Sequence, residues 1–266
     1  MRIVRATLIA LLSAVGAVGA VYFLVLRPKL REWGTDPQEA ALEMPGDDLV
    51  PEPTAIETRG VTIQATPAAI WPWLVQMGYE RAGWYSYDAL DNKGASADRI
   101  LPQFQHVAVG EVMPTHPGGG FVVKVVEPER ALVLYSDTAI VRAQSAAAEE
   151  TGKTELPGAG LKASGAMLGS SFPEFAASWA FFLRPIEGGG TRLVERFRAS
   201  TPGSGAVRAV MGEVMGTGIV LMTRKQLLGI KARVEGTLGE ADVADAAALD
   251  APAVTDEAVL AEPAGG

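Results

Sequence analysis

Residues that could bind a ligand gather between Trp84 and Arg99, in a chain that is otherwise rich in alanine and valine. This aromatic segment (residues 84–99) holds three aromatic residues, three carboxylates and one arginine. Its candidate ligand-binding residues are Trp84, Tyr85, Tyr87, Asp88, Asp98 and Arg99. The rings would line the mouth of a cavity, and the charged groups would orient a polar group of the ligand. The alternative is a structural role, in which the rings belong to the core, an aspartate caps a helix and Arg99 pairs with a carboxylate.

Glu195 is a second candidate because of its place in a predicted strand over residues 192–199. Side chains alternate between the two faces of a strand, so Glu195 shares a face with Leu193 and Phe197. The opposite face carries three arginines, Arg192, Arg196 and Arg198. We expect these arginines to lie in water, which turns Glu195 towards the apolar interior. A buried carboxylate without a partner is costly, so Glu195 should be paired, raised in pKa or used in chemistry. The alternative is an edge strand with Glu195 half exposed.

Other residues with catalytic or metal-binding side chains do not form a recognisable motif. The chain has no cysteine, and its two histidines, His106 and His116, lie ten residues apart without a zinc-binding pattern. Residues 158–163 fit only the loosest dinucleotide-binding pattern and do not follow a strand. There is no nucleophile elbow and no phosphate-binding loop. We therefore expect no metal and no cofactor. The net charge of -8 and the pI of about 4.9 argue against binding to nucleic acid.

The amino terminus contains an uncharged apolar run over residues 6–26 that is long enough to cross a bilayer. As a helix it would extend ~32 Å, against a hydrocarbon core of ~30 Å. Basic residues flank the run on both sides. The alternative is a signal peptide cleaved after Ala20, but the apolar character continues past that point and favours a retained anchor over residues 1–31. The short tail before the run favours an extracytoplasmic domain, although the flanking charges are balanced.

Composition divides the rest of the chain into three further parts. Residues 32–56 contain four prolines and predict a tether that lies over the surface of a domain. Residues 57–236 predict the folded domain, with a low-complexity insertion at 140–172 that we expect to be a lid or an unstructured loop. Residues 237–266 carry seven acidic residues and no aromatic residue, which predicts a disordered tail.

Hydrophobic patterns predict an α+β domain with an antiparallel sheet and a long C-terminal helix. Strand-like runs lie at residues 61–65, 107–113, 121–126, 131–136, 178–184 and 192–199. The last two flank Ile186-Glu-Gly-Gly-Gly190, which is typical of a hairpin. Helices are expected at residues 66–78 and 206–235. The long helix carries Met211, Met215 and Met222 on its apolar face, where methionine suits either an irregular ligand or a core.

Four short motifs give the chain a resemblance to a known superfamily. They are Trp84-Tyr-Ser-Tyr-Asp88, Ser96-Ala-Asp-Arg-Ile100, Ser178-Trp-Ala-Phe181 and Leu227-Leu-Gly-Ile-Lys231. With them the chain resembles, over about residues 32–235, the SRPBCC superfamily, which is also described as START-like, or as polyketide cyclase/dehydrase and lipid transport. It is most similar to uncharacterised bacterial members with an N-terminal membrane segment. The resemblance implies a helix-grip fold, in which a curved antiparallel sheet surrounds the long helix and an apolar cavity lies between them.

These observations give the hypothesis of a membrane-tethered domain that binds an apolar small molecule or lipid in that cavity. Residues expected around it are Trp179, Phe181, Phe197, Met211, Met215 and Met222, with Trp84, Tyr85 and Glu195 near its polar end. A bulky residue at Ala180 is expected to fill it. One alternative is a cyclase or dehydratase type of enzyme in which Glu195, Asp88 or Tyr85 transfers a proton. The other is a non-catalytic interaction module that uses the insertion or the acidic tail.

Overall fold

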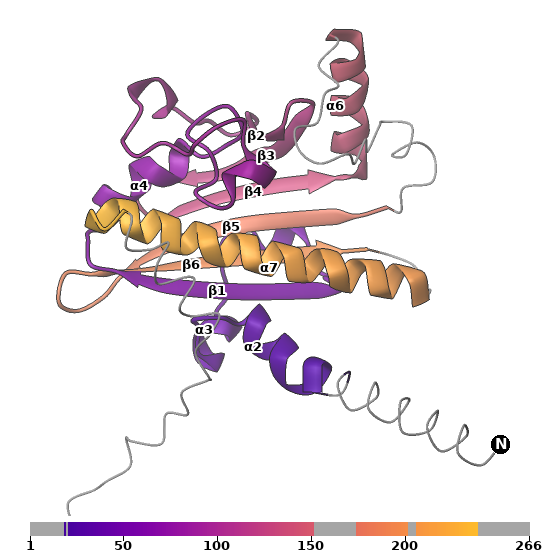
Figure 1. Cartoon of the computed structure of the whole chain (residues 1–266), viewed down its shortest axis with the longest axis horizontal. Helices are drawn as coiled ribbons and strands as arrows, with labels where there is room; N and C mark the ends of the chain where they lie inside the picture. Colours follow the sequence, from indigo (N-terminus) through magenta and orange to yellow (C-terminus); the bar gives the residue numbers. More distant parts are fainter. Residues whose placement is uncertain (1–18, 20, 152–173, 202–205, 239–266) are drawn as a thin grey trace, which may run out of the picture.

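The computed structural model describes residue 19 and residues 21–151, 174–201 and 206–238. These form an α+β fold built on one six-stranded, curved antiparallel sheet, with a long helix at its C-terminal end (Figure 1). The strand order is β1-β6-β5-β4-β3-β2, so each strand from β2 to β6 lies beside the next one in the sequence and β1 closes against β6. The predicted α+β class, with an antiparallel sheet and a long C-terminal helix, is therefore confirmed.

The elements have the following bounds. The strands are β1 (Ala55–Ile63), β2 (Val112–His116), β3 (Gly119–Glu127), β4 (Ala131–Asp137), β5 (Ala176–Pro185) and β6 (Thr191–Ser200). The helices are α2 (Arg27–Arg31), α3 (Pro37–Ala41), α4 (Pro67–Val75), α5 (Asp88–Asp91), α6 (Thr138–Thr151) and α7 (Ala206–Glu235), with the short turns η1 (Tyr22–Leu26), η2 (Asp47–Leu49) and η3 (Pro102–Phe104). The hairpin at 186–190 and the helix at 206–235 are confirmed. The strand expected from residue 107 begins only at Val112, because Gly110 turns the chain with a φ of 94°.

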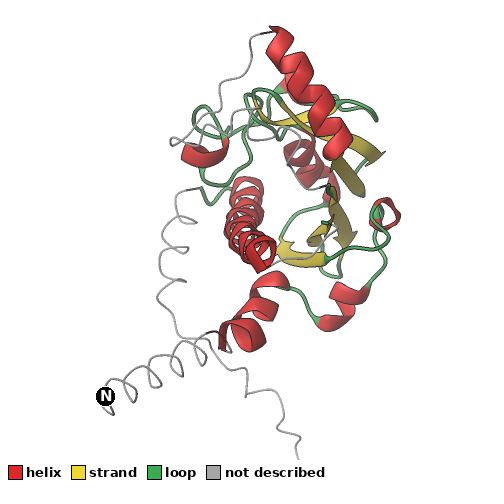
Figure 2. Ribbon diagram, turned by 90° about the vertical axis from the view of Figure 1, so that its right-hand side faces the viewer, coloured by secondary structure: helices red, strands yellow, loops and turns green. Residues whose placement is uncertain are grey.

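Two layers cover the sheet, one on each face. The helix α7 lies across the inner face, and Figure 2 shows it almost end-on beside the sheet. The N-terminal segment (residues 32–54), which includes α3 and η2, lies against the outer face. On the inner face the core is closed by α4 and by the C-terminal half of α7. Its fully buried side chains include Ile63, Ile70, Leu74, Leu193, Leu227 and Ile230.

The region expected to be a low-complexity loop differs from that expectation at its start. Residues 140–151 form most of α6, which follows β4 directly. Asp137 caps this helix, because its carboxylate accepts a hydrogen bond from the backbone N–H of Ile140 at 2.8 Å. Alanine is the strongest helix former, so an alanine-rich run with a good cap folds as a helix here. Residues 152–172 of the expected insertion and residues 239–266 of the expected tail lie outside the described residues.

The predicted membrane span also falls mostly outside the described residues, which include only residue 19 and residues 21–26 of it. Within the part of the chain that the structure describes, no helix combines the length and the apolar character that crossing a bilayer requires.

The helix α7 packs very closely on the aromatic segment at Gly229. A Cβ atom at this position would overlap the backbone oxygen of Tyr85, so only glycine permits the approach. Tyr85 in turn adopts a φ of 59°, which is uncommon for a residue with a side chain. Two of the four sequence motifs therefore meet at one contact.

Replacing Gly229 with alanine should lower the free energy of unfolding by about 1–3 kcal/mol, because the new methyl group must push α7 off the Tyr85 loop. Gly218 is the matched control, since it lies on the same helix with open space around its Cβ position. Gly218→Ala should raise stability by ~0.5–1 kcal/mol through helix propensity. Urea denaturation of the two variants measures both effects, and equal effects would contradict the close contact.

Candidate functional site

The inner face of β1, β6 and β5 carries four rows of side chains whose character changes along the strands. In order they are Val61–Leu193–Leu183, Arg59–Glu195–Phe181, Glu57–Phe197–Trp179 and Ala55–Ala199–Ala177. We call the second the charged row, the third the aromatic row and the fourth the alanine row. The first row belongs to the core under the C-terminal half of α7. The other three rows lie towards the opposite end of the strands and bring charged, aromatic and small side chains together.

Glu195 is completely buried in the charged row, as its strand pattern predicts. The edge-strand alternative does not hold, because β6 lies between β1 and β5. Arg59 donates from Nη1 to Glu195 Oε2 at 3.0 Å, and Trp179 donates from Nε1 to Glu195 Oε1 at 2.7 Å. Arg59 also donates from Nη2 to Glu57 Oε2. Two buried carboxylates therefore share one buried guanidinium group.

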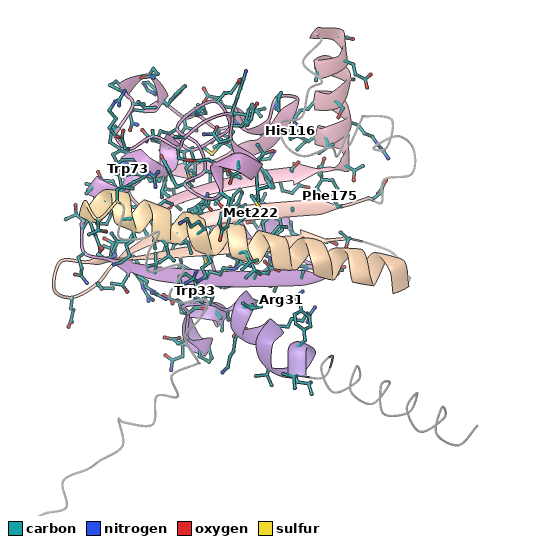
Figure 3. All side chains as sticks on the ribbon, in the orientation of Figure 1. Arg31, Trp33, Trp73, His116, Phe175 and Met222 are labelled. Atoms are coloured by element: carbon teal, nitrogen blue, oxygen red, sulfur yellow. The ribbon has the colours of Figure 1, made fainter. Side chains whose placement is uncertain are left out.

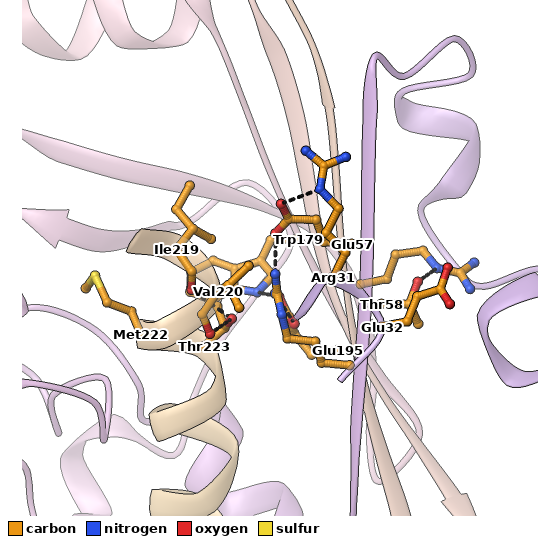
Figure 4. Close-up of polar contacts among 12 residues, drawn as sticks. Arg31, Glu32, Glu57, Thr58, Trp179, Glu195, Ile219, Val220, Met222 and Thr223 are labelled. Atoms are coloured by element: carbon orange, nitrogen blue, oxygen red, sulfur yellow. Dashed lines mark hydrogen bonds and ion pairs between the residues drawn. The ribbon is translucent and has the colours of Figure 1, made fainter. Parts of the chain in front are cut away.

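This sharing affects the protonation of Glu195. Burial raises the pKa of Glu195, and the negative charge of Glu57 adds to the rise, while Arg59 and the hydrogen bond from Trp179 act against it. Figure 4 shows Glu195 and Trp179 beside the turn of α7 that carries Ile219, Val220 and Thr223. The charged row thus lies directly beneath the helix.

Glu57 lies between the charged row and helix α2. The Nε atom of Arg31 in α2 is 3.9 Å from Glu57 Oε1, and the Arg31 side chain is 20% exposed. On α7, a Cβ atom at Gly216 would lie 3.5 Å from the same oxygen, so the helix leaves Glu57 uncovered by a side chain at this position. A pocket of about 10 Å³ is enclosed here by residues that include Tyr22, Arg27 and Val220. It has room for a single water molecule.

The aromatic row belongs to a cluster of rings contributed by three strands and the aromatic segment. Trp179 stacks on Trp84 with ring centres 5.0 Å apart and an interplanar angle of 17°. Phe121 of β3 and Phe197 of β6 meet Trp179 edge-on at 5.8 and 6.4 Å. Trp84 is buried, whereas Trp179, Phe121 and Phe197 keep part of their surface exposed. Three rings of the cluster are therefore only partly buried, and two of them, Trp179 and Phe197, neighbour the alanine row in the sheet.

The expected methionines can be followed only in part. Met222 is half-buried near the middle of α7, where Figure 3 labels it over the sheet. The side chains of Met211 and Met215 lie outside the described residues. Phe181 is fully buried in the charged row and tilts against Trp179 at 5.2 Å, so it supports the cluster from the core side.

Tyr85 has a structural role. Its hydroxyl group donates to the backbone oxygen of Trp73 at 3.1 Å and accepts from Gln76 Nε2 at 2.8 Å. The guanidinium group of Arg233 lies 4.7 Å above its ring. Burial raises the pKa of Tyr85. A neutral phenol held on both sides in this way fixes the loop against α4 and α7.

The other polar residues of the aromatic segment lie away from the inner-face rows. Asp88 accepts hydrogen bonds from the backbone N–H of Ser96 at 2.8 Å and from its hydroxyl group, which ties the segment to itself. Asp98 and Arg99 form a largely exposed pair with a 3.5 Å separation. Tyr87 is 38% exposed. Of the residues singled out in this segment, only Trp84 joins the aromatic cluster.

The structure adds three residues that the sequence reasoning missed, namely Glu57, Arg59 and Phe121. The alternation in β1 carries the signal for the first two, because Glu57 and Arg59 share a face with Val61 and Ile63. The same argument that places Glu195 inward also places them inward. Phe121 gives no comparable signal, since it follows three glycines at an irregular strand start.

The expectation that the outer arginines of β6 lie in water is wrong. The N-terminal segment covers them and supplies their partners. Arg196 is only 3% exposed and donates from Nη1 to Asp47 at 2.8 Å and to the backbone oxygen of Leu42 at 2.6 Å. Arg192 pairs with Glu39 at 2.7 Å. Arg198 donates to the backbone oxygen of Val50 at 3.0 Å.

Ala180 also faces the outer layer, in contrast to the expectation that it borders the cavity. It packs with Met44, Val133 and Val194 beneath the N-terminal segment. The alternation along β5 explains the difference, because Trp179 and Phe181 point inward and the residue between them must point outward.

Comparisons with known proteins give no family assignment. No protein-family model and no curated protein matches this chain. Similar solved structures include a protein from Mesorhizobium loti, with 16% identity, 69% of this chain and 98% of that chain covered, and a TM-score of 0.34. A conserved protein from Geobacillus kaustophilus has 12% identity, coverage of 69% and 97%, and a TM-score of 0.37. The Aha1 dimer from Colwellia psychrerythraea has 15% identity, coverage of 70% and 100%, and a TM-score of 0.31. With identities and TM-scores this low, the function has to be inferred from the residues of this chain.

The aromatic segment contains one group that titrates near neutrality. Burial raises the pKa of Asp91 to about 7, and the nearby charge of Asp88 contributes. The folded protein therefore holds a proton that the unfolded chain releases at a lower pH. Between about pH 4 and pH 7 the folded state binds more protons, so stability falls as the pH rises.

Asp91→Asn should remove this loss of stability at higher pH, because the amide cannot ionise. We expect the variant to match the wild-type melting temperature near pH 4 and to exceed it at pH 8. Thermal melts of both proteins across this range provide the measurement. Parallel curves at every pH would mean that Asp91 ionises in the folded protein as it does in water.

Proposed function

We propose that this protein is a membrane-tethered domain that binds one apolar small molecule or lipid beneath α7. The observation that carries the proposal is the pairing of the aromatic row with the alanine row. Partly exposed rings at Trp179 and Phe197 lie next to the small side chains of Ala177 and Ala199, under a helix that presents Gly216. Ligand sites of this kind combine apolar walls with a few polar groups, which Glu57 and Glu195 supply here.

The energetics support a ligand in this position. Burying apolar surface contributes a free energy of about 25 cal/mol for each Å² removed from water. Partly exposed rings inside a fold therefore favour an apolar ligand that covers them. Small side chains in the alanine row would favour such an occupant, because a methyl group on each of three neighbouring strands projects little towards α7.

We assign the fold to the helix-grip type of the SRPBCC superfamily as part of this proposal. A six-stranded antiparallel sheet with a long C-terminal helix across one face supports it. The contact between Gly229 and Tyr85 adds a second line of support, because it joins two of the motifs that carry the resemblance.

A catalytic role is the second candidate, and one observation favours it. Glu195 has a raised pKa and lies beside the proposed site, which are properties of a proton-transfer group. Tyr85 and Asp88 are held in structural hydrogen bonds, so they do not complete an acid–base pair with it. Binding without turnover is therefore the better-supported function.

The uptake of 1-dodecanol by the full chain tests the proposal, with native mass spectrometry as the measurement. We expect one bound molecule in the wild type and loss of that molecule in Ala177→Phe, whose ring would occupy the alanine row. Ala180→Phe is the matched control on the outer face of the same strand. It should keep the ligand while losing about 1–3 kcal/mol of stability by overpacking against Met44 and Val133. Failure of the wild type to bind any twelve-carbon ligand, whatever its polar end, would end the proposal.

The tether makes a separate prediction. We propose that residues 6–26 span the membrane and that the domain lies on the extracytoplasmic side. The full chain should then remain with membranes after carbonate extraction, and protease added from the extracytoplasmic side should reach the domain. A soluble mature protein that begins at Val21 would instead identify a cleaved signal peptide.

A further inference from the structure

Arg59 and Glu195 of the charged row form a cluster with Glu57 of the neighbouring aromatic row, and this cluster indicates a ligand class. Its two carboxylates, Glu57 and Glu195, share the single guanidinium group of Arg59, and all three side chains are buried. We propose that this cluster selects apolar ligands whose polar end donates hydrogen bonds, an amine or a hydroxyl group, and excludes ligands that end in a carboxylate. This inference rests on the proposed function, because it names the ligand class of the same site.

The first argument is the balance of charge. The fully enclosed part of the cluster has one more negative than positive group. Further cations come from the N-terminal side. Arg31 of the partly exposed helix α2 approaches Glu57 to 3.9 Å, and Arg27 lines the pocket beside Glu57. Water screens a partly exposed pair at this distance, so it offsets the buried excess incompletely. Burial is the main cause of the raised pKa of Glu195, and the negative charge of Glu57 adds to it. A site that favours an added proton on a carboxylate also favours a ligand group that donates a hydrogen bond to it.

The second argument is position. Glu57, Phe197 and Trp179 are direct cross-strand neighbours on the inner face. An apolar chain that lies on the rings of Trp179 and Phe197 therefore reaches Glu57 at the end of the row. Glu57 Oε2 accepts from Arg59, whereas Oε1 faces Gly216 of α7. The ligand would meet an acceptor oxygen at this point.

One competing group inside the cluster is a hydrogen-bond donor. The Nε atom of Arg59 is buried without a hydrogen-bond partner and could attract an anion. However, Arg59 has no exposed surface, and its two terminal nitrogens already hold Glu195 and Glu57. An anionic ligand would have to displace one of these carboxylates, which a hydroxyl or amine group does not require.

Three probes with the same twelve-carbon chain test the inference on the full chain, namely dodecylamine, 1-dodecanol and dodecanoate. Native mass spectrometry at pH 7 measures the affinity of each. We expect the amine and the alcohol to bind at least tenfold more tightly than dodecanoate. If dodecanoate binds as well as the others, this inference is wrong and the proposed function stands. If none of the three binds, the proposed function itself fails.

Variants separate the cluster from general charge attraction. Glu57→Gln removes one negative charge and should reduce the preference for dodecylamine over dodecanoate by about tenfold. Glu39→Gln is the matched control, because Glu39 is equally buried and ion-paired but on the outer face. It should leave the preference unchanged. An equal change in both variants, or amine binding that survives Ala177→Phe, would assign the selectivity to surface charge and overturn the inference. The comparison of probes on the wild type remains decisive if a variant does not fold.

Discussion

Strand β6 carries charge on both of its faces, and the charge on each face pairs with a residue of another element. On the inner face Glu195 needs Arg59 of β1, and on the outer face Arg196 needs Asp47 of the N-terminal segment. Removing one partner from a buried pair costs ~3–5 kcal/mol, so these contacts constrain the fold strongly. They also fix the register of β1, because a slip by one residue would turn Arg59 to the outer face beside three other arginines.

The N-terminal segment therefore acts as part of the domain and not as a flexible linker. Its proline content predicts a tether over the surface, and its position agrees with that description, but its own side chains at Glu39, Met44 and Val50 are buried against the sheet. The connection continues into α2, where Arg31 approaches Glu57 at the edge of the inner-face site. A membrane anchor before α2 would hold the domain close to the bilayer. An apolar ligand would then have a short path between the membrane and the space under α7.

Periodicity predicted the parts of this fold that depend on local pattern. The hairpin between β5 and β6, the helix α7 and the inward direction of Glu195 all follow from the spacing of apolar residues. The burial of the outer arginines could not be predicted in this way, because much of their pairing uses backbone oxygens such as those of Leu42 and Val50. The structural role of Tyr85 could not be predicted either, because it depends on a hydrogen bond from Gln76, a buried polar residue whose burial no sequence pattern indicates.

The charged row itself calls for an explanation beyond stability. Hydrophobic residues of similar volume often stabilise a core as well as a buried ion pair does. The neighbouring row of Val61, Leu193 and Leu183 shows that these strands accept such residues one step along. Charges at the next positions therefore bring a cost that packing alone does not require. The proposed site would explain this cost, because it has to orient the polar group of an otherwise apolar ligand. The charges lie next to Trp179 and Phe197, whose rings are only partly buried.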